Sequence, residues 1–111
     1  MKGDALYLNH ILDAIDTINR YISVGQKQFM AESHWQDATV RQLEIIGEAT
    51  KKLSEPLRKR YPDIPWRRIA GLRDVLIHRY MGVDLDSVWE VAHKDLPELR
   101  RKIEDIAREM P

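Results

Sequence analysis

The stretch that decides the fold is residues 4–24, which read DALYLNHILDAIDTINRYISV. Its large apolar side chains recur at steps of three and four residues, the spacing of one face of an α-helix. Asp4 suits the start of such a helix, and Gly25 suits its end. The stretch therefore predicts an amphipathic helix whose apolar stripe packs on other helices. The stripe consists of Leu8, Ile11, Ile15, Ile18 and Ile22.

The middle of the chain has the same helical pattern. We expect a helix over residues 33–53, in which the small residues Gly47 and Ala49 let another helix approach closely. Residues 26–32 before it are expected to form a connection. A short helix should follow near Pro56–Tyr61, and the prolines of the next segment should end it.

A further helix is expected from Pro65, which suits a first turn, to Tyr80. The last helix should begin near Asp86–Ser87, where Ser87 and Glu90 have the spacing of a capping box. Its apolar stripe keeps its phase across Pro97, which favours one long helix kinked at that proline over two separate helices. The stripe comprises Val88, Ala92, Leu96, Leu99, Ile103, Ile106 and Met110.

These elements predict an all-α protein, an antiparallel up-down bundle of four to five helices forming one domain over residues 1–111. The chain has no cysteine, which excludes disulfides, thiolate metal sites and a cysteine nucleophile. It has no apolar run near the roughly 20 residues of a membrane span, and its start does not resemble an export signal. We therefore expect a cytoplasmic protein without membrane contact.

The net charge is zero, but it is unevenly distributed. Residues 51–79 contain nine Lys and Arg against three Asp and Glu, a net charge of +6, whereas the remainder has nine against fifteen, a net charge of −6. The basic middle could guide an RNA backbone, dock an acidic partner, or be a solvated surface. Its side chains outside the helix discussed next are Lys51, Lys52, Arg58, Lys59, Arg60, Arg67 and Arg68.

The helix expected over 65–80 carries unusual polar residues. On an ideal helix, Arg73 and Tyr80 fall inside the apolar arc, so this face either borders a polar cleft or gives Arg73 a partner. Asp74 lies one turn before His78 and could orient its imidazole. Arg73 and His78 are about 140° apart, so a second subunit could complete a shared site. A structural Arg pair, an exposed His and a core Tyr remain the alternative.

Residues 73–80, RDVLIHRY, resemble the Arg-x4-His-x-Tyr motif of HEPN-domain toxins of the HepT-like family. Three further blocks are similar to that family in the same order. They are Ile45–Ala49, Tyr61–Trp66, and the final-helix pair Asp84–Trp89 with Asp95–Pro97. The resemblance covers about residues 5–107.

The resemblance implies a helical bundle that forms a homodimer and cleaves RNA without a metal or other cofactor. It implies that Arg73 and His78 are catalytic and that Asp74 supports them. It also implies that a cognate MNT-type nucleotidyltransferase antitoxin adds AMP to Tyr80. The alternative is a non-catalytic helical partner of such a nucleotidyltransferase, or an interaction module without one.

Other patterns predict less. Glu90 and His93 have the spacing of di-iron ligands, but a full site needs a second such pair and more carboxylates. No glycine-rich phosphate loop is present. We expect His10, His34 and His93 on the surface, and the three tryptophans in the core or an interface.

Overall fold

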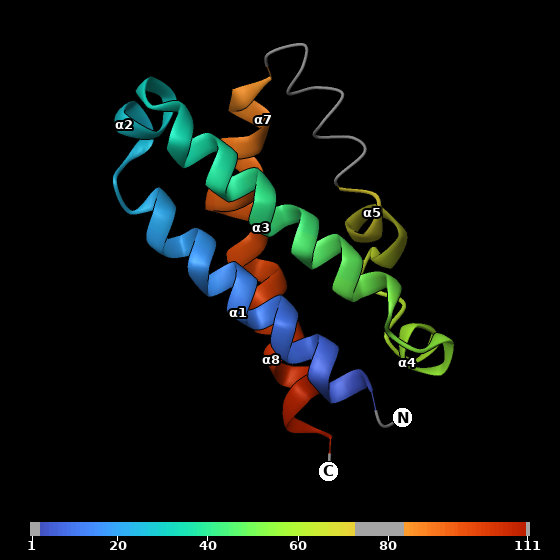
Figure 1. The fold of residues 1–111 in the computed structure, drawn as a ribbon. Coiled ribbons are helices and arrows are strands. Elements are labelled where there is room, and N and C mark those ends of the chain that lie inside the picture. Colours follow the sequence, from blue (N-terminus) through green and yellow to red (C-terminus); the bar gives the residue numbers. More distant parts are fainter. Residues whose placement is uncertain (1–2, 73–83, 111) are drawn as a thin grey trace.

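The computed structural model describes residues 3–72 and 84–110 (Figure 1). Every element within these ranges is helical, which confirms the all-α prediction. The segments are α1 (Asp4–Ile22), α2 (Gln26–Ala31), α3 (Ser33–Lys51), α4 (Glu55–Arg60), α5 (Trp66–Ala70), α7 (Leu85–Glu90), the π-helical η1 (Val91–Asp95) and α8 (Leu96–Arg108). None of the described helices has the length and apolar character needed to cross a membrane.

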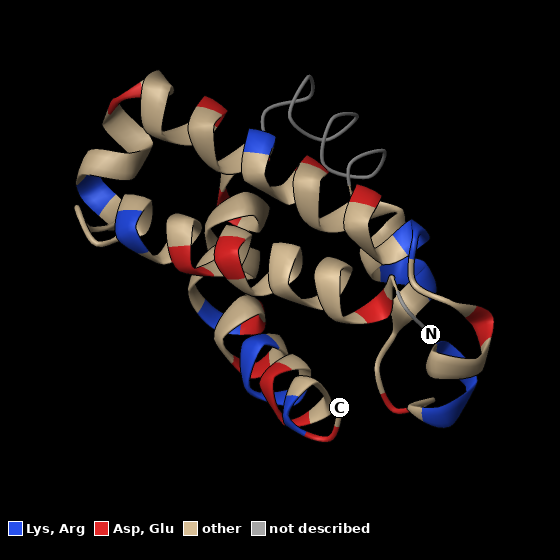
Figure 2. Ribbon diagram, turned by 60° about the horizontal axis from the view of Figure 1, so that its bottom comes forward, with Lys and Arg blue, Asp and Glu red and all other residues tan. Residues whose placement is uncertain are grey.

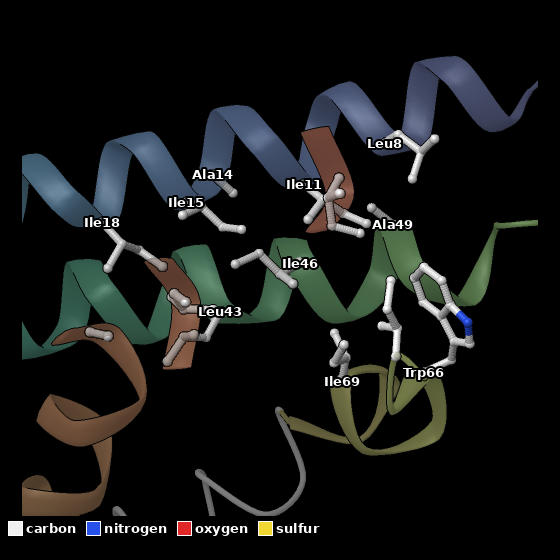
Figure 3. Packing of buried hydrophobic residues seen from close by; sticks show 14 of the residues in the cluster. Leu8, Ile11, Ala14, Ile15, Ile18, Leu43, Ile46, Ala49, Trp66 and Ile69 are labelled. Atoms are coloured by element: carbon white, nitrogen blue, oxygen red, sulfur yellow. The ribbon is translucent and has the colours of Figure 1, made fainter. Parts of the chain in front are cut away.

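Helices α1 and α3 lie side by side in opposite directions, and α8 packs against α1 (Figure 1). The stripe predicted on α1 is confirmed, because all five of its residues are buried. It faces Leu43, Ile46 and Ala49 of α3, and Trp66 and Ile69 of α5 extend this core at one end (Figure 3). Burying these apolar faces supplies the main driving force for folding.

The prediction of a connection over residues 26–32 is wrong, because Gln26–Ala31 forms the helix α2. Gly25 makes the turn before it with a φ of 96°, a conformation that glycine adopts without strain. Phe29 anchors the helix as a fully buried side chain. The Gln36 amide donates hydrogen bonds to the carbonyls of Phe29 and Met30, at 3.0 and 3.1 Å. Six residues are too few for an apolar period to show in the sequence.

The helical residues run without a break from Leu85 to Arg108, which confirms one long helix through Pro97 rather than two separate helices. Within it, Val91–Asp95 is π-helical. Its cap differs from the prediction, because Asp84 rather than Ser87 occupies the N-cap. The Asp84 carboxylate accepts the Ser87 amide at 3.1 Å and the Ser87 hydroxyl at 2.7 Å. The π-helical turn ends at Asp95, two residues before Pro97, and Pro97 has no N–H to donate to the carbonyl four residues earlier. At the end of the π-helical turn, the Leu96 amide donates to the carbonyl of Val91, five residues earlier.

The helix predicted from Pro65 to Tyr80 is also corrected within the described residues. Pro65 is the N-cap rather than the first turn of α5, and α5 ends at Ala70. Gly71 forms a turn, after which Leu72 is again helical. The prediction that Arg73 and Tyr80 fall inside the apolar arc of α5 required an uninterrupted helix from Ile69 onward. The turn at Gly71 interrupts that helix, so the prediction no longer has this basis.

Candidate functional site

The four predicted site residues, Arg73, Asp74, His78 and Tyr80, lie outside the described residues. The structure instead describes the frame on both sides of them. Helix α5 and Leu72 lead into the segment, and Asp84 with α7 follows it. The frame is built from the same sequence blocks that resemble the HepT-like family.

The block Tyr61–Trp66 anchors the start of α5. The Trp66 indole is buried and donates from Nε1 to the Tyr61 carbonyl at 3.0 Å. Ile64 is also buried, and its amide bonds to the same carbonyl at 3.3 Å. These contacts fold the proline-rich segment back on itself, so that α5 begins from a fixed position.

The block Ile45–Ala49 receives the other end of α5. A Cβ atom placed on Gly47 would lie 3.2 Å from the Ala70 carbonyl oxygen and 3.4 Å from that of Ile69. The predicted close approach at Gly47 is thus confirmed. The end of α5, which leads toward the site segment, occupies the space left by the missing Gly47 side chain.

An open hollow of about 270 Å³ lies between α5 and the η1–α8 helix. Its apolar lining includes Leu72, the residue before Arg73, together with Ile69 and Leu99. Both signs of charge lie at its edge, and Lys102 and Glu98 approach each other to 3.9 Å. The remaining lining residues are Pro65, Arg68, Val91, Asp95 and Leu96. Sequence analysis missed this hollow, because its residues come from two helices far apart in the chain.

The block Asp84–Trp89 fixes the chain where it re-enters the described bundle. Asp84 caps α7, as described above, and the indole of Trp89 lies 5.3 Å from the Phe29 ring. The His93 ring stacks on the Trp89 indole, with the ring centroids 5.4 Å apart. Phe29 of α2 thereby packs against the last turn of α7.

The remaining candidates have surface environments. His93 is exposed, and within residues 3–72 and 84–110 no three His, Asp or Glu side chains converge as metal ligands. His10 contacts the edge of the Tyr7 ring, and His34 lies 3.5 Å from a Glu32 carboxylate oxygen. Both are exposed, as predicted.

Comparison with known proteins decides the family. The chain matches the family described as "Ribonuclease HepT-like" over residues 11–106. The chain belongs to the HepT-like ribonuclease family. All four resembling blocks, including residues 73–80, lie inside the matched range.

Curated HepT-like relatives agree with this assignment. "Gamma-glutamylcyclotransferase and putative RNase MJ0434" of Methanocaldococcus jannaschii is 44% identical over 98% of this chain, which spans only 50% of that relative. "Putative RNase TTE0752" of Caldanaerobacter subterraneus subsp. tengcongensis is 40% identical over 96% of both chains. "Probable ribonuclease HepT" of Thermococcus cleftensis is 38% identical over 92% of this chain and 94% of its own. No solved structure gives a significant match.

Proposed function

We propose that this protein is a metal-independent endoribonuclease and the toxin of a HEPN/MNT toxin–antitoxin pair. The observation that carries the proposal is the complete Arg73-x4-His78-x-Tyr80 pattern inside the range that matches the ribonuclease family. The contact of Gly47 with the end of α5 supports it, because the resembling block Ile45–Ala49 meets α5 at Ala70, three residues before the motif.

The proposed chemistry uses the RNA's own 2′-hydroxyl. Its oxygen loses its proton and forms a bond to the adjacent phosphorus while the bond to the 5′-oxygen breaks. The departing oxygen gains a proton, so the products are a 2′,3′-cyclic phosphate and a 5′-hydroxyl. His78 transfers a proton in this step, and Asp74 orients its imidazole. Arg73 stabilises the negative charge that grows on the phosphoryl oxygens.

Two partners belong to the proposal. A second copy of the chain would bring a second motif helix to the cleft, which accommodates the wide angle between Arg73 and His78. An MNT-type nucleotidyltransferase would add AMP to the Tyr80 oxygen. The added group is bulky and anionic, so it would exclude RNA by size and by charge.

The test is induced expression of wild type, Arg73→Ala and His78→Ala, with circular dichroism to show that each is folded. His34→Ala is the matched control, because His34 is an exposed histidine outside the motif and outside the frame described above. We expect growth arrest from wild type and the control only. Purified wild type should release cyclic-phosphate products in excess EDTA. Equal arrest by folded His78→Ala would contradict the proposal in favour of a binding partner. Cleavage that needs a divalent metal would contradict the proposed mechanism.

A further inference from the structure

The described segment Lys51–Arg68 concentrates positive charge at one end of the molecule. It contains seven Lys and Arg against two Asp and Glu. Figure 2 shows these basic positions gathered where α3 ends and where α4 and α5 pack, whereas α8 alternates basic and acidic residues. A neutral chain therefore has one strongly basic end, which favours an anionic partner there.

Few of these cations are neutralised locally. Lys51 pairs with Glu48 at 3.2 Å, and Lys59 pairs with Glu55 at 3.0 Å. For the other five, no carboxylate oxygen in the described part of the chain lies within 4.0 Å. We call these five the basic surface: Lys52, Arg58, Arg60, Arg67 and Arg68. All except the half-buried Arg58 are exposed.

The frame beneath the basic surface is well fixed. Asp4 is buried at the start of α1 and accepts hydrogen bonds from the Ser54 amide at 2.8 Å and from the Ser54 hydroxyl at 2.6 Å. Ser54 in turn caps α4, and Trp66 and Gly47 fix α5 as described above. Cations on a fixed frame lose less entropy when they bind a partner.

The basic surface also leads directly into the proposed catalytic segment. Arg68 lies five residues before Arg73, so the length of the chain limits their Cα separation to about 18 Å. Arg68 also lines the hollow beside Leu72. A strand cleaved by Arg73 and His78 therefore has this surface within reach along its backbone.

We propose that the basic surface binds the phosphate backbone of the RNA substrate beside the cleavage site. The inference rests on the proposed ribonuclease function and names the surface that holds its substrate. Four of the five cations are arginines, whose planar guanidinium groups bind phosphate oxygens in pairs. Such contacts position the strand without reading its sequence. The five cations extend from the end of α3 over α4 and α5. A linear polyanion such as RNA can contact such an extended surface better than a single acidic patch on a protein can.

The experiment measures binding of a labelled 2′-O-methyl RNA, which lacks the 2′-hydroxyl needed for cleavage. Wild type is compared with Arg67→Gln/Arg68→Gln between about 50 and 200 mM NaCl. The matched control is Arg20→Gln/Lys27→Gln, which removes two exposed cations near the opposite end of the bundle. Circular dichroism and thermal melting check that all three proteins are folded.

We expect the Arg67/Arg68 variant to bind about tenfold more weakly at low salt, with the slope of log affinity against log salt reduced by one to two. The control should match wild type in affinity and slope.

Several results would overturn the inference. Wild-type affinity and slope in the Arg67/Arg68 variant would do so, as would an equal loss in the control. Unchanged RNA binding with lost binding to the purified nucleotidyltransferase would assign the surface to a protein partner instead. If wild type binds this RNA through the surface but cleaves no RNA, the ribonuclease proposal fails and the surface assignment stands.

Discussion

Gly47 lies where the end of α5 meets α3, and its missing side chain decides how closely they pack. In an exposed helix, Gly47→Ala would stabilise the protein by about 1 kcal/mol through helix propensity. Here the new Cβ would press on the Ala70 carbonyl at 3.2 Å. Backbone on both sides resists movement, so overpacking should cost about 2 kcal/mol and exceed the gain.

We therefore expect Gly47→Ala to lower the free energy of unfolding, by about 1 kcal/mol, and to reduce RNA cleavage. Urea unfolding and a cleavage assay measure the two effects. Glu48→Ala is the neighbouring control, since Glu48 is exposed and its ion pair among the described residues is the surface pair with Lys51. A stabilised Gly47→Ala protein would show that α5 does not constrain this position.

Asp4 joins the first residue of α1 to the cap of α4, fifty positions along the chain. Removing its carboxylate leaves the Ser54 amide and hydroxyl without their acceptor. Asp4→Ala should cost about 2 kcal/mol of unfolding free energy. Asp4→Asn should cost less, because its amide oxygen can still accept the Ser54 amide. Asp13→Ala on the exposed face of α1 should change stability by less than about 0.5 kcal/mol in the same urea titration.

At the scale of elements, charged side chains join α8 to α1. Arg100 donates to Asp16 at 2.6 Å and to Glu104 at 2.6 Å, and Arg108 donates to Glu104 at 2.7 Å. The hydrogen bond from Arg108, followed by that from Arg100, lowers the pKa of Glu104 below its ordinary value. A lowered pKa stabilises the fold above the ordinary value and loses this effect as the pH falls through the lowered one.

Acidification below about pH 4.5 should therefore weaken the fold less in Glu104→Gln than in wild type. Urea titrations at several pH values measure the difference. High salt should shrink it, because these groups face solvent. Glu98→Gln is the control, since its pair with Lys102 on the same helix is long at 3.9 Å. Identical pH profiles for Glu104→Gln and wild type would contradict this role.

The whole molecule divides its charge between a basic end and a more acidic remainder, at zero net charge. The proposed cleft needs a second motif helix, so we expect a homodimer in solution. Light scattering during gel filtration should give twice the chain mass of 13.1 kDa. A monomer that still cleaves RNA, at a concentration where light scattering shows no dimer, would contradict the two-subunit cleft.

Much of the fold could be predicted from the sequence, because the apolar periodicity of an amphipathic helix indicates which face it buries. The stripe of Leu8, Ile11, Ile15 and Ile18 is the buried face of α1, and Gly47 is the predicted point of close approach. Helix α2 could not be predicted, since one buried phenylalanine and a distant glutamine amide hold it. The N-cap of α7 is Asp84 rather than the predicted Ser87, because the Asp84 carboxylate lies three residues before Ser87 and accepts its amide.

The sequence by itself determined the helical class, the buried stripes, the charge imbalance and the motif that led to the ribonuclease family. These depend on local periodicity and residue chemistry, which are written along the chain. Tertiary structure alone decided that Asp4 holds α4 and that a hollow opens between α5 and α8. Each of these joins residues distant in sequence, and their meeting depends on how whole helices pack.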